Sequence, residues 1–103
     1  MKNLSKVSQL FDVYHQLLSK KQCDYIMDYY FNDFSLSEMS NKYNISRAAV
    51  HYSIKNGIKD LQKYENKLKF LSLQKERLKI YNEIKDEKIR LKLINHENGS
   101  SKV

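Results

Sequence analysis

The fold is decided by the stretch SLSEMSNKYNISRAAVHYSIKNGI, residues 35–58 of this 103-residue chain. Ser35 and Glu38 form a Ser-x-x-Glu pair, in which each side chain bonds a free backbone N–H at a helix start. Asn44 stands at the following turn, because Asn tolerates a left-handed backbone. Ser46 is then placed to cap a second helix. The pattern predicts a helix-turn-helix, in which the second helix is the recognition helix.

Apolar residues at helical spacing support this interpretation on both sides of the turn. Ile45 is expected to fill the turn between the two helices. The first helix has an inward face of Leu36, Met39 and Tyr43. The second helix has an inward stripe made of Val50, Ile54, Ile58 and Leu61.

The start of the second helix carries the candidate nucleic-acid contacts. In a helix-turn-helix, side chains at this position reach base edges, while the cap and the flanks bind phosphates. The residues that we expect to make these contacts are Ser46, Arg47, Ala48, His51, Tyr52 and Lys55.

These side chains have different chemistry. Arg47 can form a bidentate fork with guanine or bind a phosphate. Ser46 and Lys55 are better placed for the backbone, and Ala48 can meet a thymine methyl group. His51 and Tyr52 can hydrogen-bond or stack.

A purely structural role is the alternative for two of these residues. Arg47 can pair with an acid such as Glu38, and Tyr52 can pack against a neighbouring helix.

The rest of the chain has the composition of an all-α protein, with no proline and only two glycines. Apolar spacing predicts a helix over residues 4–18 and a second one from a Ser19 cap to about Phe31, with Gln22 completing a capping box. The inner face of the second helix is expected to be Cys23, Ile26, Met27 and Tyr30. We therefore predict an all-α helical bundle that contains a helix-turn-helix.

One domain is expected over residues 1–94. It would consist of supporting helices in residues 1–34, the helix-turn-helix in residues 35–58 and a C-terminal helical segment in residues 59–94. Residues 95–103 contain Gly-Ser-Ser and no apolar pattern, so they are expected to be a flexible tail.

The helical pattern continues from Ser46 almost without pause into the 90s, with Gly57 inside it at a bend or at a close approach by another helix. A narrow apolar seam follows at heptad-like spacing, and such a seam needs a partner that buries it. It can fold back on the first two helices or pair with a second chain, and we favour a homodimer. The seam residues are Leu61, Tyr64, Leu68, Leu71 and Leu78.

Catalytic chemistry finds little support in the sequence. His15, His51 and His96 lie far apart, Cys23 has no neighbouring ligand, and no glycine-rich phosphate loop occurs. We expect no enzyme, no metal site and no cofactor. A lone cysteine fits a reducing compartment, and no apolar run approaches the roughly 20 residues of a membrane span. A cytoplasmic protein without membrane insertion is therefore expected.

The chain has a formal net charge of +7, and the basic excess begins at the predicted recognition helix. Such an excess suits a polyanionic partner. The alternative is a compositional origin, because the basic residues are 16 Lys and three Arg among many Asn and Ile, as in an AT-rich genome.

The sequence also resembles a known family. The string YYFNDFSLSEMSNKYNISRAAVHYSIK, the following LQKYENKL and the earlier LFDVYHQLLSKKQ resemble the YlxM family of small helix-turn-helix proteins of low-GC Gram-positive bacteria and mollicutes. The resemblance covers about residues 4–71, and its motif is also similar to region four of bacterial sigma factors. Gln is common in the family where Ala48 stands and an acid near Tyr52, and Asn56-Gly57 replaces bulkier polar residues. If Ala48 and Tyr52 contact bases, a changed target sequence is expected; the alternative is that these positions do not contact bases.

What the resemblance implies is a non-enzymatic regulatory or accessory protein of the signal recognition particle pathway, because the genes of this family lie beside those of the particle's GTPase and its receptor. We expect DNA binding through the helix-turn-helix. The alternative is an adaptor that binds the particle's RNA or its GTPase through the basic C-terminal helix, since a recognition helix does not fit the deep, narrow groove of A-form RNA. A third possibility is a structural helical protein that makes no nucleic-acid contact.

Overall fold

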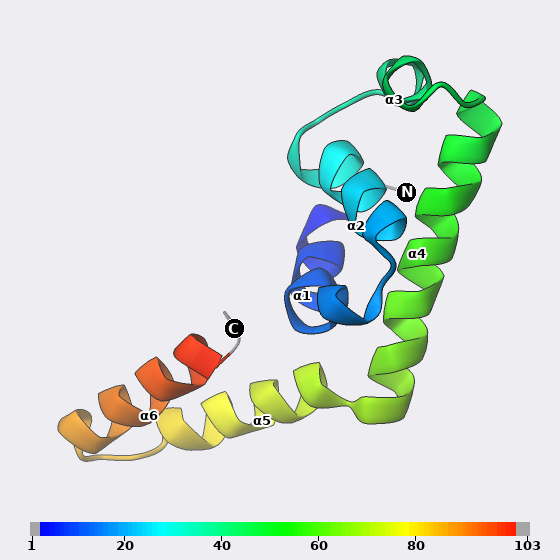
Figure 1. The fold of residues 1–103 in the computed structure, drawn as a ribbon. Coiled ribbons are helices and arrows are strands. Elements are labelled where there is room, and N and C mark those ends of the chain that lie inside the picture. Colours follow the sequence, from blue (N-terminus) through cyan, green and yellow to red (C-terminus); the bar gives the residue numbers. More distant parts are fainter. Residues whose placement is uncertain (1–2, 101–103) are drawn as a thin grey trace.

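The computed structural model describes residues 3–100, which form six α-helices and two short helical turns (Figure 1). The helices are α1 (Leu4–Tyr14), α2 (Lys20–Ile26), α3 (Leu36–Tyr43), α4 (Arg47–Leu68), α5 (Phe70–Asn82) and α6 (Glu87–Ser100). A 3-10 turn (His15–Leu17) follows α1, and a π-helical turn (Met27–Phe31) extends α2. These residues contain no strand, which confirms the predicted all-α class. None of their helices combines the length and apolarity that a membrane crossing requires.

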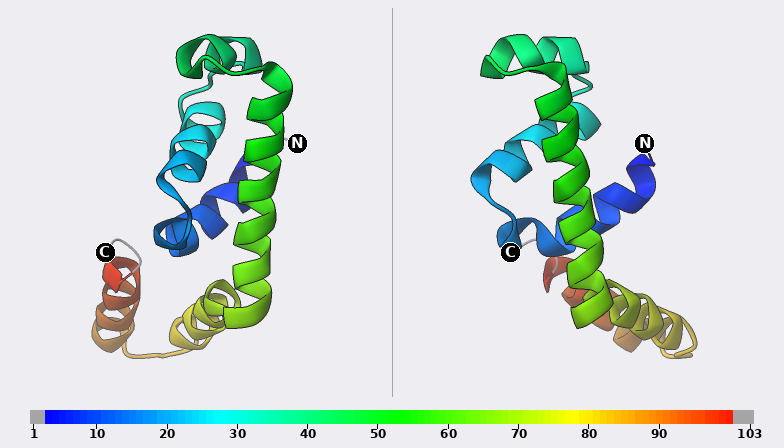
Figure 2. Two further views of the ribbon diagram at one scale, coloured as in Figure 1. Left: turned by 45° about the vertical axis from the view of Figure 1, so that its right-hand side comes forward. Right: turned by 90° about the vertical axis from the view of Figure 1, so that its right-hand side faces the viewer.

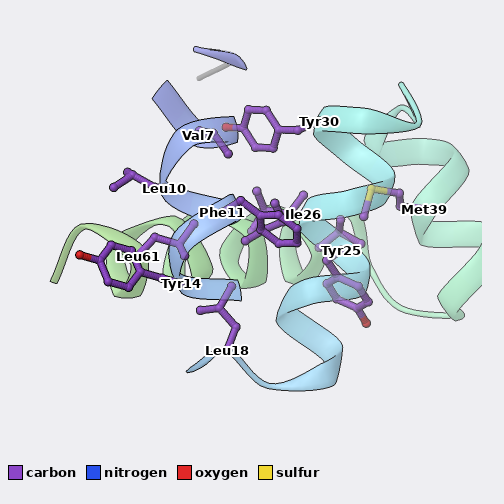
Figure 3. Close-up of a cluster of buried hydrophobic side chains, with 12 residues drawn as sticks. Val7, Leu10, Phe11, Tyr14, Leu18, Tyr25, Ile26, Tyr30, Met39 and Leu61 are labelled. Atoms are coloured by element: carbon purple, nitrogen blue, oxygen red, sulfur yellow. The ribbon is translucent and has the colours of Figure 1, made fainter. Parts of the chain in front are cut away.

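α4 is the central helix of the fold, and α1, α2, α3 and α5 all contact it. It runs along one side of the molecule, with α1 and α2 against its inner face and α3 across its N-terminal end (Figures 1 and 2). Its predicted inward stripe is confirmed, because Val50, Ile54 and Leu61 are fully buried and Ile58 packs beside them. Figure 3 shows the core that these residues share with α1 and α2. The other buried members are Val7, Leu10, Phe11, Tyr14, Leu18, Tyr25, Ile26, Tyr30 and Met39.

Gly57 lies where α2 meets the backbone of α4. A Cβ atom added at Gly57 would lie 2.8 Å from Cδ1 of Ile26, a side chain that is itself fully buried. The close approach explains why α4 carries a residue that costs about 1 kcal/mol relative to Ala in a helix interior. Of the two roles that the sequence left open for Gly57, close approach by another helix is the one observed.

The inner face of α2 differs in part from the prediction. Ile26 and Tyr30 are buried, but Met27 is 40% exposed and Tyr25 is buried in its place. The inner face is shifted toward Tyr25, whose ring centroid lies 4.5 Å from that of Tyr43 on α3. The π-helical turn, in which the N–H of Asn32 donates to the carbonyl of Met27, changes the helical spacing only after Met27.

The helix that begins at Arg47 does not continue unbroken into the 90s. Lys69 has a left-handed backbone (φ 57°), which ends α4 and begins α5 in a new direction (Figure 1). A second break separates α5 from α6 at residues 83–86. α6 includes residues 95–100, which were expected to be a tail, and the remaining tail residues 101–103 lie outside the described part of the chain.

Side chains satisfy the free N–H groups at the start of α5. The Glu65 carboxylate accepts from the backbone N–H groups of Leu71 and Ser72, each at 3.1 Å. The Tyr14 hydroxyl accepts from the N–H of Phe70 at 3.1 Å and donates to Glu65 at 2.6 Å. Burial alone would raise the pKa of Glu65, but these donors outweigh burial and lower it. The corner between α4 and α5 is therefore tied to α1.

This corner determines what buries the predicted dimer seam. Leu61 is fully buried within the chain, and Tyr64 and Leu71 pack against the same core. Leu78 is half-buried on α5, whereas Leu68 remains 39% exposed. Of the two alternatives, most of the seam therefore folds back on the N-terminal helices, and an assembly that needs all five residues free for a second chain is ruled out.

Leu61→Ala is expected to lower the free energy of unfolding by about 2–5 kcal/mol, because it removes a fully buried side chain. Urea denaturation would measure the difference in unfolding free energy between the wild type and Leu61→Ala. This difference should be the same at every protein concentration. Leu4→Ala, at a side chain 49% exposed on α1, is the matched control and should cost far less. A loss for Leu61→Ala that grows with protein concentration would contradict the packing within one chain.

Candidate nucleic-acid interface

The local signals of the helix-turn-helix are all present as the sequence predicts. Ser35 Oγ accepts from the N–H of Glu38 at 3.0 Å, and the Glu38 carboxylate accepts from the N–H of Ser35 at 2.9 Å. Asn44 ends α3 with a left-handed backbone (φ 55°, ψ 47°). Ser46 Oγ then accepts from the N–H of Ala49 at 3.0 Å and starts α4. Two capped helices joined by this tight turn define the motif.

Ser40 holds the turn in place, a role that was not foreseen. Its hydroxyl donates to the carbonyl of Ile45 at 2.5 Å, and its own carbonyl accepts from the N–H of Ile45 at 3.2 Å. The Ile45 side chain packs against the core beside Leu36 and Tyr43, as a plug would. The angle between the two helices is therefore fixed by both polar and apolar contacts.

A buried carboxylate fastens α3 to the supporting helices. Asp28 in the π-helical turn is only 5% exposed. It accepts from the Tyr43 hydroxyl, from Lys42 Nζ at 3.0 Å and from Asn32 Nδ2 at 3.1 Å. Sequence reasoning missed this cluster, although an acid within the aromatic run DYIMDYYF was a signal, because a buried acid needs partners.

The partners of Asp28 also set its charge state. Burial would raise the pKa of the carboxyl, but hydrogen bonds from Tyr43, Lys42 and Asn32 outweigh burial, and the pKa lies below its usual value. The pKa of the Tyr43 hydroxyl is raised, by burial first and by its bond to Asp28 second. The cluster is therefore most stable with Asp28 ionised and Tyr43 protonated.

The six candidate contact residues come together at the start of α4. The side chains of Ser46, Arg47, Ala48, His51, Tyr52 and Lys55 are all exposed, outside the buried stripe. Tyr52 is 67% exposed, so it does not pack against a neighbouring helix. Arg47 Nη1 lies 3.5 Å from Ser37 Oγ, and the Glu38 carboxylate is engaged in the capping box. The two structural alternatives for Arg47 and Tyr52 are therefore not realised.

Cys23 has a structural environment. Its thiol donates to the carbonyl of His15 at 3.2 Å, and burial raises the pKa of the thiol, which disfavours the reactive thiolate. Within residues 3–100, no group of three or more His, Cys, Asp or Glu side chains is arranged to hold a metal ion.

These features define a helix-turn-helix protein with an exposed recognition helix. A family model described as "Putative helix-turn-helix protein, YlxM / p13 like" matches residues 1–99. The chain belongs to this family, and the resemblance noted in the sequence is confirmed.

Relatives from several bacteria are similar over most of their length. A UPF0122 protein of Malacoplasma penetrans is 45% identical over 95 residues, which cover 92% of this chain and 89% of the relative. The YlxM protein of Bacillus subtilis is 38% identical over 86 residues, covering 84% and 78%. A UPF0122 protein of Mycoplasma pneumoniae is 37% identical over 89 residues, covering 86% and 87%.

Asp28→Asn is expected to lower the free energy of unfolding at neutral pH by about 2 kcal/mol, because it weakens charge-assisted hydrogen bonds at a buried site. A carboxyl with a lowered pKa stabilises the fold above its unfolded pKa of about 4, and this stabilisation is lost as the pH falls through the lower folded value. Urea denaturation from neutral to acidic pH would show the loss in the wild type and a weaker dependence in Asp28→Asn.

Asp24→Asn is the matched control, since Asp24 forms only an exposed pair with Lys20 at 3.0 Å. That pair should contribute little to stability. Equal effects of the two substitutions would argue against a special role for Asp28.

Proposed function

We propose that this protein is a non-enzymatic regulatory factor that binds duplex DNA through its helix-turn-helix. The observation that carries the proposal is the exposed start of α4, where Arg47, His51, Tyr52 and Lys55 stand outside the buried stripe. In this motif the recognition helix enters the major groove while the preceding helix crosses the backbone. α3 lies across the N-terminal end of α4, which suits that division of roles (Figure 2).

The charge of α4 supports a polyanionic partner. The helix carries five basic and two acidic side chains. Both acids are engaged within the chain, since Asp60 accepts from Gln22 Nε2 at 2.8 Å and Glu65 caps α5. Among the described residues, the ion pairs lie elsewhere, on α2, α3 and the α5–α6 arm. The positive charge of α4 is therefore available to phosphates.

Each candidate residue has a role that its geometry allows. Arg47 is free of any carboxylate and can form a fork with guanine. The Ser46 hydroxyl accepts from Ala49, so its own proton can be donated to a phosphate. Ala48 leaves room for a thymine methyl group beside Arg47.

An adaptor that binds the RNA or the GTPase of the signal recognition particle is the alternative. It would use the C-terminal arm, residues 70–100, which comprises α5, α6 and the turn between them and has seven basic but also five acidic side chains. Arg77 in this arm is held by Glu97, with Nη2 at 2.6 Å from Oε1. This mixed charge favours α4, and hence DNA, as the polyanion contact. The link to the particle itself rests on the family resemblance.

A homodimer is part of the proposal. α5 and α6 leave Leu73, Ile80, Ile89 and Leu91 between 45% and 59% exposed, and α5 buries no side chain fully. Exposed apolar side chains gathered on one arm are typical of an association surface. Two copies joined there would present two recognition helices to half-sites of a symmetric DNA site.

Arg47→Ala is expected to cost about 1–3 kcal/mol in binding to a preferred duplex and to relax base preference at the position that it reads. Selection of duplexes from a random library, followed by fluorescence anisotropy, would measure both effects. Arg90→Ala on α6 is the matched control and should bind as the wild type does. If the wild type binds no duplex even at low salt, where phosphate contacts are strongest, the DNA proposal is wrong.

Ile80→Glu is expected to abolish self-association, since it introduces a charge at a side chain 59% exposed on the arm. Sedimentation velocity over a range of concentrations would show a shift from dimer to monomer. Asn82→Glu, at an exposed position near the end of α5, is the matched control. A wild type that remains monomeric at high concentration would remove the dimer from the proposal.

A further inference from the structure

Basic side chains follow one row along the whole of α4. They recur at steps of four residues, and all are exposed: Arg47, His51, Lys55, Lys59, Lys63 and Lys67. Such a row is inclined by roughly 26° to the helix axis, so it crosses the outward side of the helix obliquely. With a rise of about 1.5 Å per residue, the row is about 30 Å long. The candidate base-contacting residues occupy only its first part.

The far part of the row is polar. The acid beside it, Asp60, accepts a hydrogen bond from Gln22 Nε2 at 2.8 Å. Between the lysines stand Asn56, Gln62 and Asn66, whose side chains form no hydrogen bond with another described residue. Lysine ammonium groups and side-chain amides are donors that proteins use to contact phosphate oxygens. This half of α4 therefore has the chemistry of a backbone-binding surface.

The shape of the surface agrees with its chemistry. A hollow of about 580 Å³ lies beside α2 on this half of α4, with Lys59, Lys63 and Asp60 in its lining and Gln22 at the α2 side. In the right-hand view of Figure 2, α4 lies in front of the supporting helices over most of its length. Each step of four residues turns the row by about 40° about the helix axis, so the row winds from one flank of α4 to the other. Lys59 and Lys63 lie in its outward part, opposite the buried stripe, and are open to a long, rigid ligand.

We infer that duplex DNA lies lengthwise against α4, and that Lys59 and Lys63 bind its phosphates beyond the part of the helix that reads bases. This inference rests on the proposed function and adds the orientation of the complex. The major groove winds away from a straight helix, so base edges are reachable only from the first turns. At about 18 and 24 Å along the axis from Arg47, the two lysines meet the backbone at the wall of the groove.

The contrasting orientation places α4 end-on in the groove. Lys59 and Lys63 would then lie too far from the duplex to bind its phosphates, so they would release no counterions from the DNA. The two orientations therefore differ in the salt dependence of binding, because each phosphate that a lysine neutralises adds about 0.9 to the slope of log K against log salt.

The test compares K59Q/K63Q with the wild type, using the full chain and a labelled duplex of mixed sequence that is long enough to cover all of α4. Fluorescence anisotropy over a salt series is expected to show a slope smaller by about 2 in K59Q/K63Q. The order of preference among duplexes should stay unchanged, because phosphate contacts carry no base information. K75Q/K79Q on α5, with the same loss of charge at exposed positions, is the control and should keep the wild-type slope.

Two results would overturn the inference while leaving the proposed function standing. In the first, K59Q/K63Q keeps the wild-type slope, or loses no more than K75Q/K79Q, while Arg47→Ala still weakens binding. In the second, K59Q/K63Q changes base preference instead of lowering affinity uniformly. Failure of the wild type to bind any duplex would remove the inference and the proposed function together. Circular dichroism of both variants would confirm that their helix content is unchanged.

Discussion

The packing of α2 against α4 at Gly57 is the contact on which the rest of the structure depends. The missing side chain at Gly57 lets Ile26 approach the backbone of α4, and Ile26 belongs to the same buried cluster as the inward side chains of α1. Because α1 and α2 cover only one side of α4, the opposite side stays in solvent over all of its turns. The same helix therefore contributes one face to the hydrophobic core and carries an exposed row of basic side chains on the other.

This division between two faces separates stability from recognition. Val50, Ile54 and Leu61 cannot change without loss of packing, whereas Ala48 and Tyr52 contact little of the chain itself. Substitutions on the outward face can therefore change the exposed surface of the helix while the fold is preserved. Two positions at which this chain departs from its family resemblance, Ala48 and Tyr52, lie on that outward face, whereas a third, Gly57, lies at the buried contact with α2.

The parts of the fold that depend on neighbouring residues could be predicted from the sequence. The capping box at Ser35, the left-handed Asn44 and the buried stripe of α4 each follow from a spacing of a few residues. Contacts between distant segments could not be predicted. Lys69 has no local signal for a left-handed backbone, and it is held there by Glu65 together with Tyr14, which lies more than 50 residues earlier. The Asp28 cluster likewise depends on Tyr43, 15 residues later. The exposure of the six candidate contact residues followed from helical periodicity, but their partners require experiment.

The corner at Lys69 also couples the recognition helix mechanically to the arm. Three consecutive amide groups at the beginning of α5 find their acceptors on Glu65 and Tyr14, so a swing of the arm about Lys69 would strand all three. Leaving these partly buried N–H donors without acceptors would cost free energy, so the start of α5 is expected to keep its orientation relative to α4. A change in the direction of α4 is therefore passed to the start of α5 through Glu65 and Tyr14, and a displacement of α5 reaches α4 by the same contacts.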